Sequence, residues 1–244
     1  MADMSEGVFH CRDAGERFLG EKSVDLFIGH PPYYQAELEL NGGDPAKQMQ
    51  SAGSLDEYWG RLVSSMLHME YALKEDGHIF FALQNTSLGL GVLPKIASET
   101  SLELQSIRMW DYSNGSSDPG NNTVIFAHYT KKTWGPGDLP QGPFVLTNSW
   151  EEAYPELEQY NQEYSTVGAA PTGIYREMIK NFSKQGGVVC DLFAGCGTVQ
   201  VVALEMDRKF IYNDVSEDKV LVAKKRIEDC KKRDLAQLVR ADGS

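Results

Sequence analysis

Two short apolar runs, each ending in a loop with glycine or proline, constrain the fold of this chain most strongly. The first run is Val24–Ile28, followed by Gly29–Pro32, and the second is Val188–Phe193, followed by Ala194–Gly197. Uninterrupted apolar runs between such breakers are typical of strands that are buried on both faces, as in a parallel sheet. We therefore expect two parallel strands, each leading directly into a loop at its carboxyl end.

Helical and strand patterns alternate along the rest of the chain. Apolar residues recur at helical spacing from Leu55 to Leu73, and after a turn at Asp76-Gly77 the residues His78–Leu83 form a predicted strand. The remaining predicted helices are residues 92–100, 173–183, 198–206 and 217–238, and the remaining predicted strands are 102–110, 123–129 and 209–212. The strands 102–110 and 123–129 are expected to form an antiparallel edge. The sequence therefore predicts an α/β fold with a mixed, mostly parallel sheet.

The composition is that of one soluble domain, residues 1–244. Of the 244 residues, 41% are hydrophobic and 24% are charged, and no apolar run approaches the roughly 20 residues of a membrane span. Neither end carries a targeting or lipidation signal, so we expect a cytoplasmic protein with no membrane segment. The cysteines lack the spacing of zinc ligands or of a disulfide framework, so we expect reduced thiols and no metal: Cys11, Cys190, Cys196 and Cys230.

The loop Asp191–Thr198 has the features of a nucleotide-binding loop. It lies between a predicted strand and a predicted helix, where glycines let a ligand approach the backbone and the helix start offers free N–H groups. Taken alone, the pattern fits a structural turn equally well. Asp214 follows the next strand, roughly 20 residues further on, where a carboxylate can accept hydrogen bonds from both hydroxyls of a ribose. Because Val199-Gln200 replaces the third glycine of a dinucleotide fingerprint, adenosine is favoured over NAD.

The loop Gly29–Tyr34 has the features of a site for a planar amine. Proline has no N–H group, so the two prolines stiffen the loop and leave the carbonyls of His30 and Pro31 free to accept hydrogen bonds from an amine. Tyr33 offers a flat face on which a nucleobase can stack. The alternative is a rigid strand exit with one core tyrosine.

With both motifs present, the chain resembles the amino-methyltransferase family of DNA methylases, which make N6-methyladenine or N4-methylcytosine. In that family a tetrapeptide Asp/Asn/Ser-Pro-Pro-Tyr/Phe/Trp pairs with a motif around Phe-x-Gly-x-Gly, and here these are His30–Tyr33 and Phe193–Gly197. Residues 74–80 and 171–182 resemble further segments of the family, so the resemblance covers most of the chain. Because the catalytic motif comes first, the order resembles the β class, in which the motif order is circularly permuted.

The resemblance implies a Rossmann-like fold that uses S-adenosyl-L-methionine, with a mixed, mostly parallel seven-stranded sheet and helices on both faces. It implies DNA as the substrate, no metal, and catalytic roles for His30, Pro31, Pro32 and Tyr33. The residues implied to bind the cofactor are Asp191, Phe193, Gly195, Gly197, Thr198 and Asp214, together with Asp13, for which a structural turn is an equal interpretation.

His30 departs from the family pattern. The usual Asp, Asn or Ser accepts a hydrogen from the target amine through a side-chain oxygen, whereas an imidazole can accept one only while it is neutral. We therefore expect activity to fall when His30 becomes protonated. The implied reaction is direct methyl transfer to a base flipped out of DNA, with no covalent intermediate. Methylation of cytosine C5 is disfavoured, because none of the cysteines follows a proline as the nucleophile of that family does.

The net charge limits how the chain could hold DNA. The formal charge is −12, whereas non-specific DNA affinity depends on Lys and Arg. Basic residues cluster at Lys131-Lys132 and in a C-terminal series that also fits a solvated helix face: Lys224, Lys225, Arg226, Lys231, Lys232 and Arg233. The target-recognition loops implied by the resemblance, about 114–122 and 133–168, are small and partly acidic. A homodimer or a partner subunit is therefore a further expectation.

Two other function classes stay open. RNA or protein-glutamine methylation is the second hypothesis, since related Pro-Pro-Tyr pockets accept planar amides and RNA bases. A non-catalytic subunit that binds S-adenosylmethionine is the third, with His30 marking lost activity. Trp110 and Trp134 are candidates for a base channel, although core tryptophans are commoner, and His10 and His128 are expected to be structural or surface residues. The sequence leaves open the base, the recognition site, and a role in restriction-modification, a phage or regulation.

Overall fold

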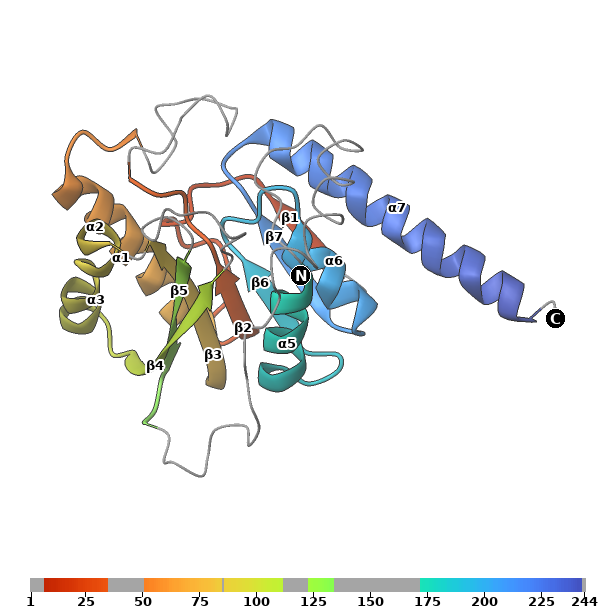
Figure 1. Ribbon diagram of the computed structural model, residues 1–244, viewed down its shortest axis with the longest axis horizontal. Helices are drawn as coiled ribbons and strands as arrows, with labels where there is room; N and C mark the ends of the chain where they lie inside the picture. Colours follow the sequence, from red (N-terminus) through yellow and green to blue (C-terminus); the bar gives the residue numbers. More distant parts are fainter. Residues whose placement is uncertain (1–6, 35–50, 85, 112–122, 134–171, 243–244) are drawn as a thin grey trace.

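The computed structural model describes residues 7–34, 51–84, 86–111, 123–133 and 172–242 (Figure 1). Seven strands in these ranges form one sheet: β1 (Gly7–His10), β2 (Val24–Gly29), β3 (Leu73–Gln84), β4 (Glu103–Asp111), β5 (Thr123–Thr130), β6 (Val188–Asp191) and β7 (Lys209–Asn213). Their order across the sheet is β1-β7-β6-β2-β3-β5-β4. β5 is antiparallel to both of its neighbours and every other neighbouring pair is parallel. The predicted mixed sheet with an antiparallel edge is confirmed.

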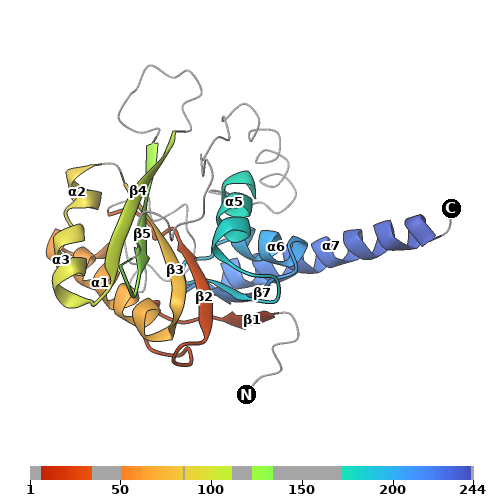
Figure 2. The same ribbon diagram turned by 90° about the horizontal axis from the view of Figure 1, so that it is seen from below.

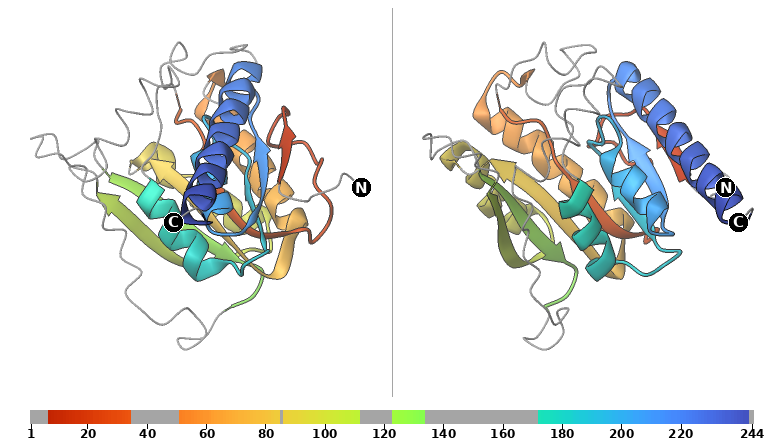
Figure 3. Two further views of the ribbon diagram at one scale, coloured as in Figure 1. Left: turned by 90° about the vertical axis from the view of Figure 1, so that its right-hand side faces the viewer. Right: turned by 45° about the vertical axis from the view of Figure 1, so that its right-hand side comes forward.

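Helices cover both faces of the sheet, as predicted. One face carries α1 (Leu55–Ala72), α2 (Ser87–Leu90) and α3 (Leu93–Glu99), and the other carries α5 (Thr172–Phe182), α6 (Thr198–Glu205) and α7 (Glu217–Asp242) (Figure 1, Figure 2). Figure 3 shows α5, α6 and α7 lying together on this second face.

Burial on both faces explains the apolar runs in the sequence. Strand side chains alternate between the faces, so Phe27 of β2 belongs to the core beside α1, whereas Leu26 and Ile28 belong to the core beside α5 and α6. A strand that must fill two cores has no polar face, and its sequence shows no alternation.

Side-chain capping sets the start of α1. The Ser54 hydroxyl accepts a hydrogen bond from the N–H of Glu57 (3.2 Å), and the Glu57 carboxylate accepts one from the N–H of Gly53 (2.9 Å). The N–H of Glu57 would otherwise lack an intrahelical partner, since the first turn of a helix leaves its N–H groups unpaired, and the bond from Gly53 holds the segment that leads into the helix.

The structure differs from the predicted elements at several boundaries. β1 and α2 are additional, because segments of four residues are too short to show a periodic pattern. The turn predicted at Asp76-Gly77 does not begin the strand, since β3 starts at Leu73, directly after α1. Residues 74–77 instead interrupt the pairing with β2, where Val24 pairs with Leu73 but Leu26 pairs with His78. The extra residues therefore form an irregularity inside β3.

Some predicted features lie outside the described residues. These are the recognition segment 114–122, the segment 133–168 except for Thr133, and Trp134. Within the ranges that the structure describes, no helix is long and apolar enough to cross a membrane.

Candidate active site

Four loops of the described chain leave the same edge of the sheet. The strands β1, β7, β6 and β2 are consecutive neighbours and run parallel, so their carboxyl ends share one edge. The segments that follow these strands are residues 11–16, 214–216, 192–197 and 30–34. Ligands of open α/β sheets bind beyond the carboxyl ends of the strands. The sheet order thus gathers segments that are far apart in the sequence.

The two predicted motifs are packed against each other. Phe27 of β2 pairs with Cys190 of β6, so the loops after these strands begin side by side. A Cβ placed on Gly29 would lie 3.5 Å from the ring of Phe193 and 3.3 Å from the methyl group of Met69. The start of the His30 loop therefore lies in van der Waals reach of Phe193.

The loop between β6 and α6 presents an accessible backbone. Gly195 and Gly197 have φ angles of +51° and +80°, in the left-handed region that favours glycine. A Cβ on Gly195 would meet nothing within 4 Å, whereas one on Gly197 would lie 3.1 Å from the Cβ of Ala223 in α7. Gly195 thus borders open space that a ligand can use, and Gly197 permits the packing of α7 against the loop.

Two carboxyl groups border the same loop. Oδ1 of Asp191 accepts a hydrogen bond from the N–H of Phe193 (2.8 Å), and Oδ2 of Asp214 accepts one from the N–H of Gly195 (2.9 Å). Burial raises the pKa of Asp191 to about 8, and it also raises the pKa of Asp214 despite the backbone hydrogen bonds to that group. A ligand that brings positive charge or hydroxyl donors would stabilise both carboxylates.

Residues that sequence reasoning missed hold the loop in place. The side-chain amide of Asn213 donates to the carbonyls of Leu192 and Arg12, each at 3.0 Å, and its oxygen accepts from the N–H of Arg12 (3.1 Å). The hydroxyl of Tyr212 donates to the Gly195 carbonyl (2.7 Å). Tyr212 is the last residue of the predicted strand 209–212 and Asn213 follows it, and the strand pattern carries no signal for these contacts.

Arg226 corrects the interpretation of the basic C-terminal series. Its side chain is fully buried, and Nη1 donates to the Thr198 hydroxyl at 2.9 Å and lies 3.4 Å from the Cys196 carbonyl. It is therefore part of the support of the glycine loop and does not belong to a solvated helix face. The neighbouring Lys224, Lys225, Lys231 and Lys232 are exposed, in agreement with the solvated-face prediction. The side chain of Arg233 lies outside the described residues.

The His30 loop is internally bonded and anchored to α1. Nε2 of His30 lies 3.0 Å from the hydroxyl oxygen of Tyr33, and the Tyr58 hydroxyl donates to the Pro32 carbonyl (3.1 Å). The hydrogen bond from Tyr58 therefore uses the Pro32 carbonyl, and not the carbonyls of His30 and Pro31 that were predicted to accept from an amine. Burial lowers the pKa of His30 to about 4, so the imidazole is neutral at neutral pH. Pro31 is buried, whereas Tyr33 is half-buried.

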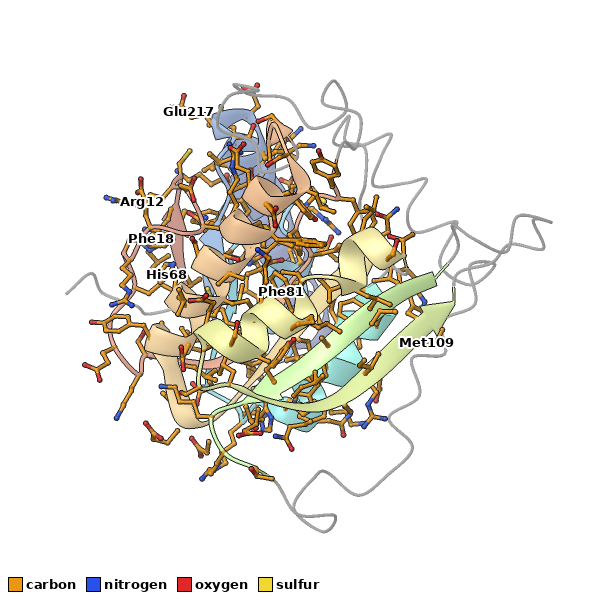
Figure 4. The ribbon with its side chains drawn as sticks, turned by 90° about the vertical axis from the view of Figure 1, so that its left-hand side faces the viewer. Arg12, Phe18, His68, Phe81, Met109 and Glu217 are labelled. Atoms are coloured by element: carbon orange, nitrogen blue, oxygen red, sulfur yellow. The ribbon has the colours of Figure 1, made fainter. Side chains whose placement is uncertain are left out.

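Asp13 lies in the loop after β1 and forms a turn. Its Oδ1 accepts a hydrogen bond from the N–H of Gly15 (2.8 Å), which is the turn role considered for it. His68 of α1 holds the following segment: its Nδ1 lies 3.0 Å from the Ala14 carbonyl, and its ring packs edge-on against Phe18 with centroids 4.7 Å apart. Figure 4 shows His68 and Phe18 close together beside α1. A contact of Asp13 with the cofactor stays a prediction.

The remaining candidates have structural roles in this fold. Trp110 is buried in the core, and His128 is buried with its Nε2 3.0 Å from Nδ1 of His78. His10 is half-buried, with its ring 4.7 Å from that of Phe18. These positions agree with the structural interpretation of Trp110, His10 and His128.

Comparison with known families identifies the class of protein. The sequence model of a DNA methylase family matches residues 24–225, which include both motifs. The chain belongs to the DNA methylase family. The methylase is an S-adenosylmethionine-dependent enzyme that transfers a methyl group to the exocyclic amino group of adenine or cytosine in DNA. The predicted reaction class and cofactor are thereby confirmed.

Similar proteins share the architecture of the methylase. It is 23% identical over 230 residues to the type II methyltransferase M.HpaI of Haemophilus parainfluenzae, covering 86% of this chain and 70% of the relative. The PvuII DNA methyltransferase (cytosine-N4-specific) has a similar fold, with a TM-score of 0.72, 17% identity, and coverage of 94% of this chain and 92% of the other. TTHA0409 from Thermus thermophilus, in complex with S-adenosyl-L-methionine, gives a TM-score of 0.62 at 16% identity, covering 92% and 95% of the two chains.

The glycine loop of the methylase fits its cofactor. S-adenosylmethionine carries positive charge on its sulfonium and amine and has two ribose hydroxyls. Burial disfavours the charged carboxylates of Asp191 and Asp214. The positive charge and the ribose hydroxyls of S-adenosylmethionine would stabilise these carboxylates. The open space at Gly195 leaves the loop backbone accessible to the ligand.

Proposed function

We propose that the His30–Tyr33 loop holds the target base and that the Gly195–Thr198 loop holds S-adenosylmethionine, so that the methyl group is transferred where the two loops meet. The observation that carries this proposal is the packing of Gly29 against Phe193, which joins the two loops. The chain would act as a single methyltransferase domain, residues 1–244, with target recognition by the segments at about 114–122 and 133–168.

On the cofactor side, each residue has a proposed role. Asp214 would accept hydrogen bonds from the ribose hydroxyls, and Asp191 would face the charged methionine part. Gly195, Gly197 and Thr198 would bring the loop backbone and the start of α6 against the ligand. Phe193 would lie beside the methionine part, and Asp13 would accept a hydrogen bond from the adenine amine.

On the substrate side, the residues of the loop would activate a weak nucleophile. The lone pair of the amino nitrogen is delocalised into the base, and accepting the two amine hydrogens at His30 and at the Pro31 carbonyl would localise it. Tyr33 would stack on the flipped base and hold it in line. S-adenosylmethionine supplies an electrophilic methyl group on its sulfonium. As the N–C bond forms and the C–S bond breaks, the amine releases one proton.

DNA binding by this acidic chain calls for help from a second molecule. The formal charge is −12, and some of the basic groups serve the fold: Arg226 is buried, and Lys131 donates to the Leu73 carbonyl at 2.7 Å. Because counterion release requires basic surface, a homodimer or a partner subunit would strengthen binding. We propose a cytoplasmic location, where DNA is accessible to the enzyme.

The relatives support a site-specific modification enzyme. M.HpaI is named a type II methyltransferase, and the PvuII enzyme is named cytosine-N4-specific. A role in restriction-modification, with adenine or cytosine as the target, is consistent with both names.

Methyl transfer to unmethylated DNA tests the proposal. The methylase is incubated with labelled S-adenosylmethionine, and the DNA is digested to nucleosides for mass spectrometry. N6-methyladenine or N4-methylcytosine is expected, and Tyr33→Ala should abolish it. The matched control is Tyr71→Ala, a substitution in α1, where Tyr71 packs under Arg17 (5.0 Å from the guanidinium carbon to the ring centroid). This control should leave methylation unchanged.

The same assay separates the other function classes. If RNA or protein glutamine is methylated and DNA at low salt is not, the proposed substrate is wrong. If the cofactor binds but none of the three substrates is methylated, the chain is a non-catalytic binding subunit.

A further inference from the structure

The side chains of His30 and Tyr33 form a pair within the catalytic loop. Nε2 of His30 lies 3.0 Å from the Tyr33 hydroxyl oxygen, and the two rings are 5.5 Å apart and tilted by 49°. Of the two imidazole nitrogens, Nε2 is therefore the one engaged with Tyr33. Phe126 is a further neighbour of His30, an apolar ring 6.3 Å away in an edge-on arrangement.

The hydrogen bond to Tyr33 can have either of two directions. A neutral imidazole has one N–H and one acceptor nitrogen. If the tyrosine O–H donates, Nε2 is used as the acceptor and Nδ1 carries the hydrogen. If the Nε2–H donates to the tyrosine oxygen, Nδ1 keeps its lone pair. An amine that approaches with its own N–H needs the second arrangement, because two donors cannot bond to each other.

We propose that the Tyr33 hydroxyl is a positioning group that holds His30 in the Nε2–H form, so that Nδ1 can accept a hydrogen from the target amine. The inference rests on the proposed function. Tyr33 then has two separate tasks: its ring stacks on the base, and its oxygen selects the tautomer of His30. A neighbouring group that fixes which ring nitrogen is protonated is a recurrent feature of histidine sites.

The composition of the motif supports this division of tasks. An Asp, Asn or Ser oxygen always has a lone pair and needs no tautomer selection. With histidine at the first position, as in this chain, the hydroxyl acquires a task that Phe or Trp cannot perform.

A double-mutant cycle tests the inference on the full chain. The four proteins are wild type, Tyr33→Phe, His30→Asn and the double variant, with unmethylated DNA and labelled S-adenosylmethionine. Tyr33→Phe keeps the stacking ring, so the single-turnover rate should fall about tenfold, the usual effect of one lost hydrogen bond in the transition state, while cofactor affinity stays unchanged. In the His30→Asn background the same change should have less than about a threefold effect. Equal losses in both backgrounds, or no loss in wild type, would overturn the inference.

Nitrogen NMR gives a readout that does not depend on turnover. In protein labelled with ¹⁵N at histidine, the His30 signals are assigned by their loss in His30→Asn. Wild type should show a protonated Nε2 and an unprotonated Nδ1, and Tyr33→Phe should shift the population toward the other tautomer. A protonated Nδ1 in wild type contradicts the inference even if the asparagine variants are inactive. A wild type with this tautomer that methylates no DNA would instead contradict the proposed function.

Discussion

Nη1 of Arg226 donates a hydrogen bond to the hydroxyl of Thr198 at 2.9 Å, which ties the middle of α7 to the first residue of α6. The same guanidinium lies 3.4 Å from the Cys196 carbonyl, so a buried cation supports the glycine loop Gly195–Thr198. Arg226 therefore holds the glycine loop through contacts with Cys196 and Thr198.

Arg226→Met should weaken cofactor binding. Removing the guanidinium leaves buried acceptors on Cys196 and Thr198 without this donor, which costs about 1–3 kcal/mol. We expect the Kd for S-adenosylmethionine, measured by calorimetry, to rise roughly tenfold. Lys225→Met, at the exposed neighbouring position, is the control and should not change the Kd. Equal affinity in the two variants would mean that Arg226 does not order the loop.

Gly195→Ala and Gly186→Ala form a matched pair. Both glycines have positive φ, +51° and +74°, and a Cβ on either would meet nothing within 4 Å. Each substitution should therefore cost about 1–2 kcal/mol of backbone strain. In calorimetric titrations, we expect only Gly195→Ala to lose cofactor affinity, because its Cβ would occupy the space in front of the loop. A similar loss of cofactor affinity in Gly186→Ala would mean that lower folding stability, and not contact with the ligand, causes the effect.

Tyr58→Phe should slow methyl transfer without weakening cofactor binding. The substitution removes the hydrogen bond to the Pro32 carbonyl (3.1 Å), which anchors the His30 loop to α1. Unfolding free energy should fall by about 0.5–1.5 kcal/mol, and the single-turnover rate by several fold. Tyr71→Phe on the same helix keeps its ring beside Arg17 and should match wild type. A raised cofactor Kd in Tyr58→Phe would contradict a role limited to the catalytic loop.

The methylation rate should be insensitive to mild acid. Burial lowers the pKa of His30 to about 4, so the imidazole remains neutral as the pH falls from 8 to 6. A histidine with the ordinary pKa of about 6.5 would be roughly three-quarters protonated at pH 6. Single-turnover rates at saturating DNA and cofactor are therefore expected to be constant over this range, because the bound cofactor also keeps Asp191, whose pKa burial raises to about 8, in its charged form. A decrease of the rate at acidic pH with a midpoint near 6.5 would mean that burial does not lower the pKa of His30.

Folding stability, by contrast, should fall as the pH drops below about 6.5. Burial lowers the pKa of His78 to about 4 and of His128 to about 3. Below about pH 6.5 the unfolded chain binds protons that the folded chain does not, so stability decreases as the pH falls, by up to about 1.4 kcal/mol per pH unit for each histidine. Denaturation at several pH values gives the unfolding free energy as a function of pH. His128→Leu should reduce the slope of that dependence by the equivalent of about one proton. An unchanged slope would mean that His128 is protonated in the fold.

Local sequence was enough to predict most of the sheet and both motifs. β2 and β6 were predictable because strands that face a core on both sides are mostly apolar, and Leu26 and Phe27 fill the two cores on opposite faces of β2. The Pro-Pro loop and the glycine loop were predictable because proline and glycine fix backbone conformation through their own covalent structure. The short strand β1 escaped prediction, since four residues show no period.

The tertiary structure decided which residues support the site. Sequence spacing could not show that Gly29 lies against Phe193, that Arg226 bonds Thr198, or that His30 and Tyr33 share a hydrogen bond. Sheet order and helix packing determine such contacts. The physical reason is that a residue's type and neighbours set its backbone preferences, whereas burial, partner and pKa depend on groups that only the folded chain brings near it.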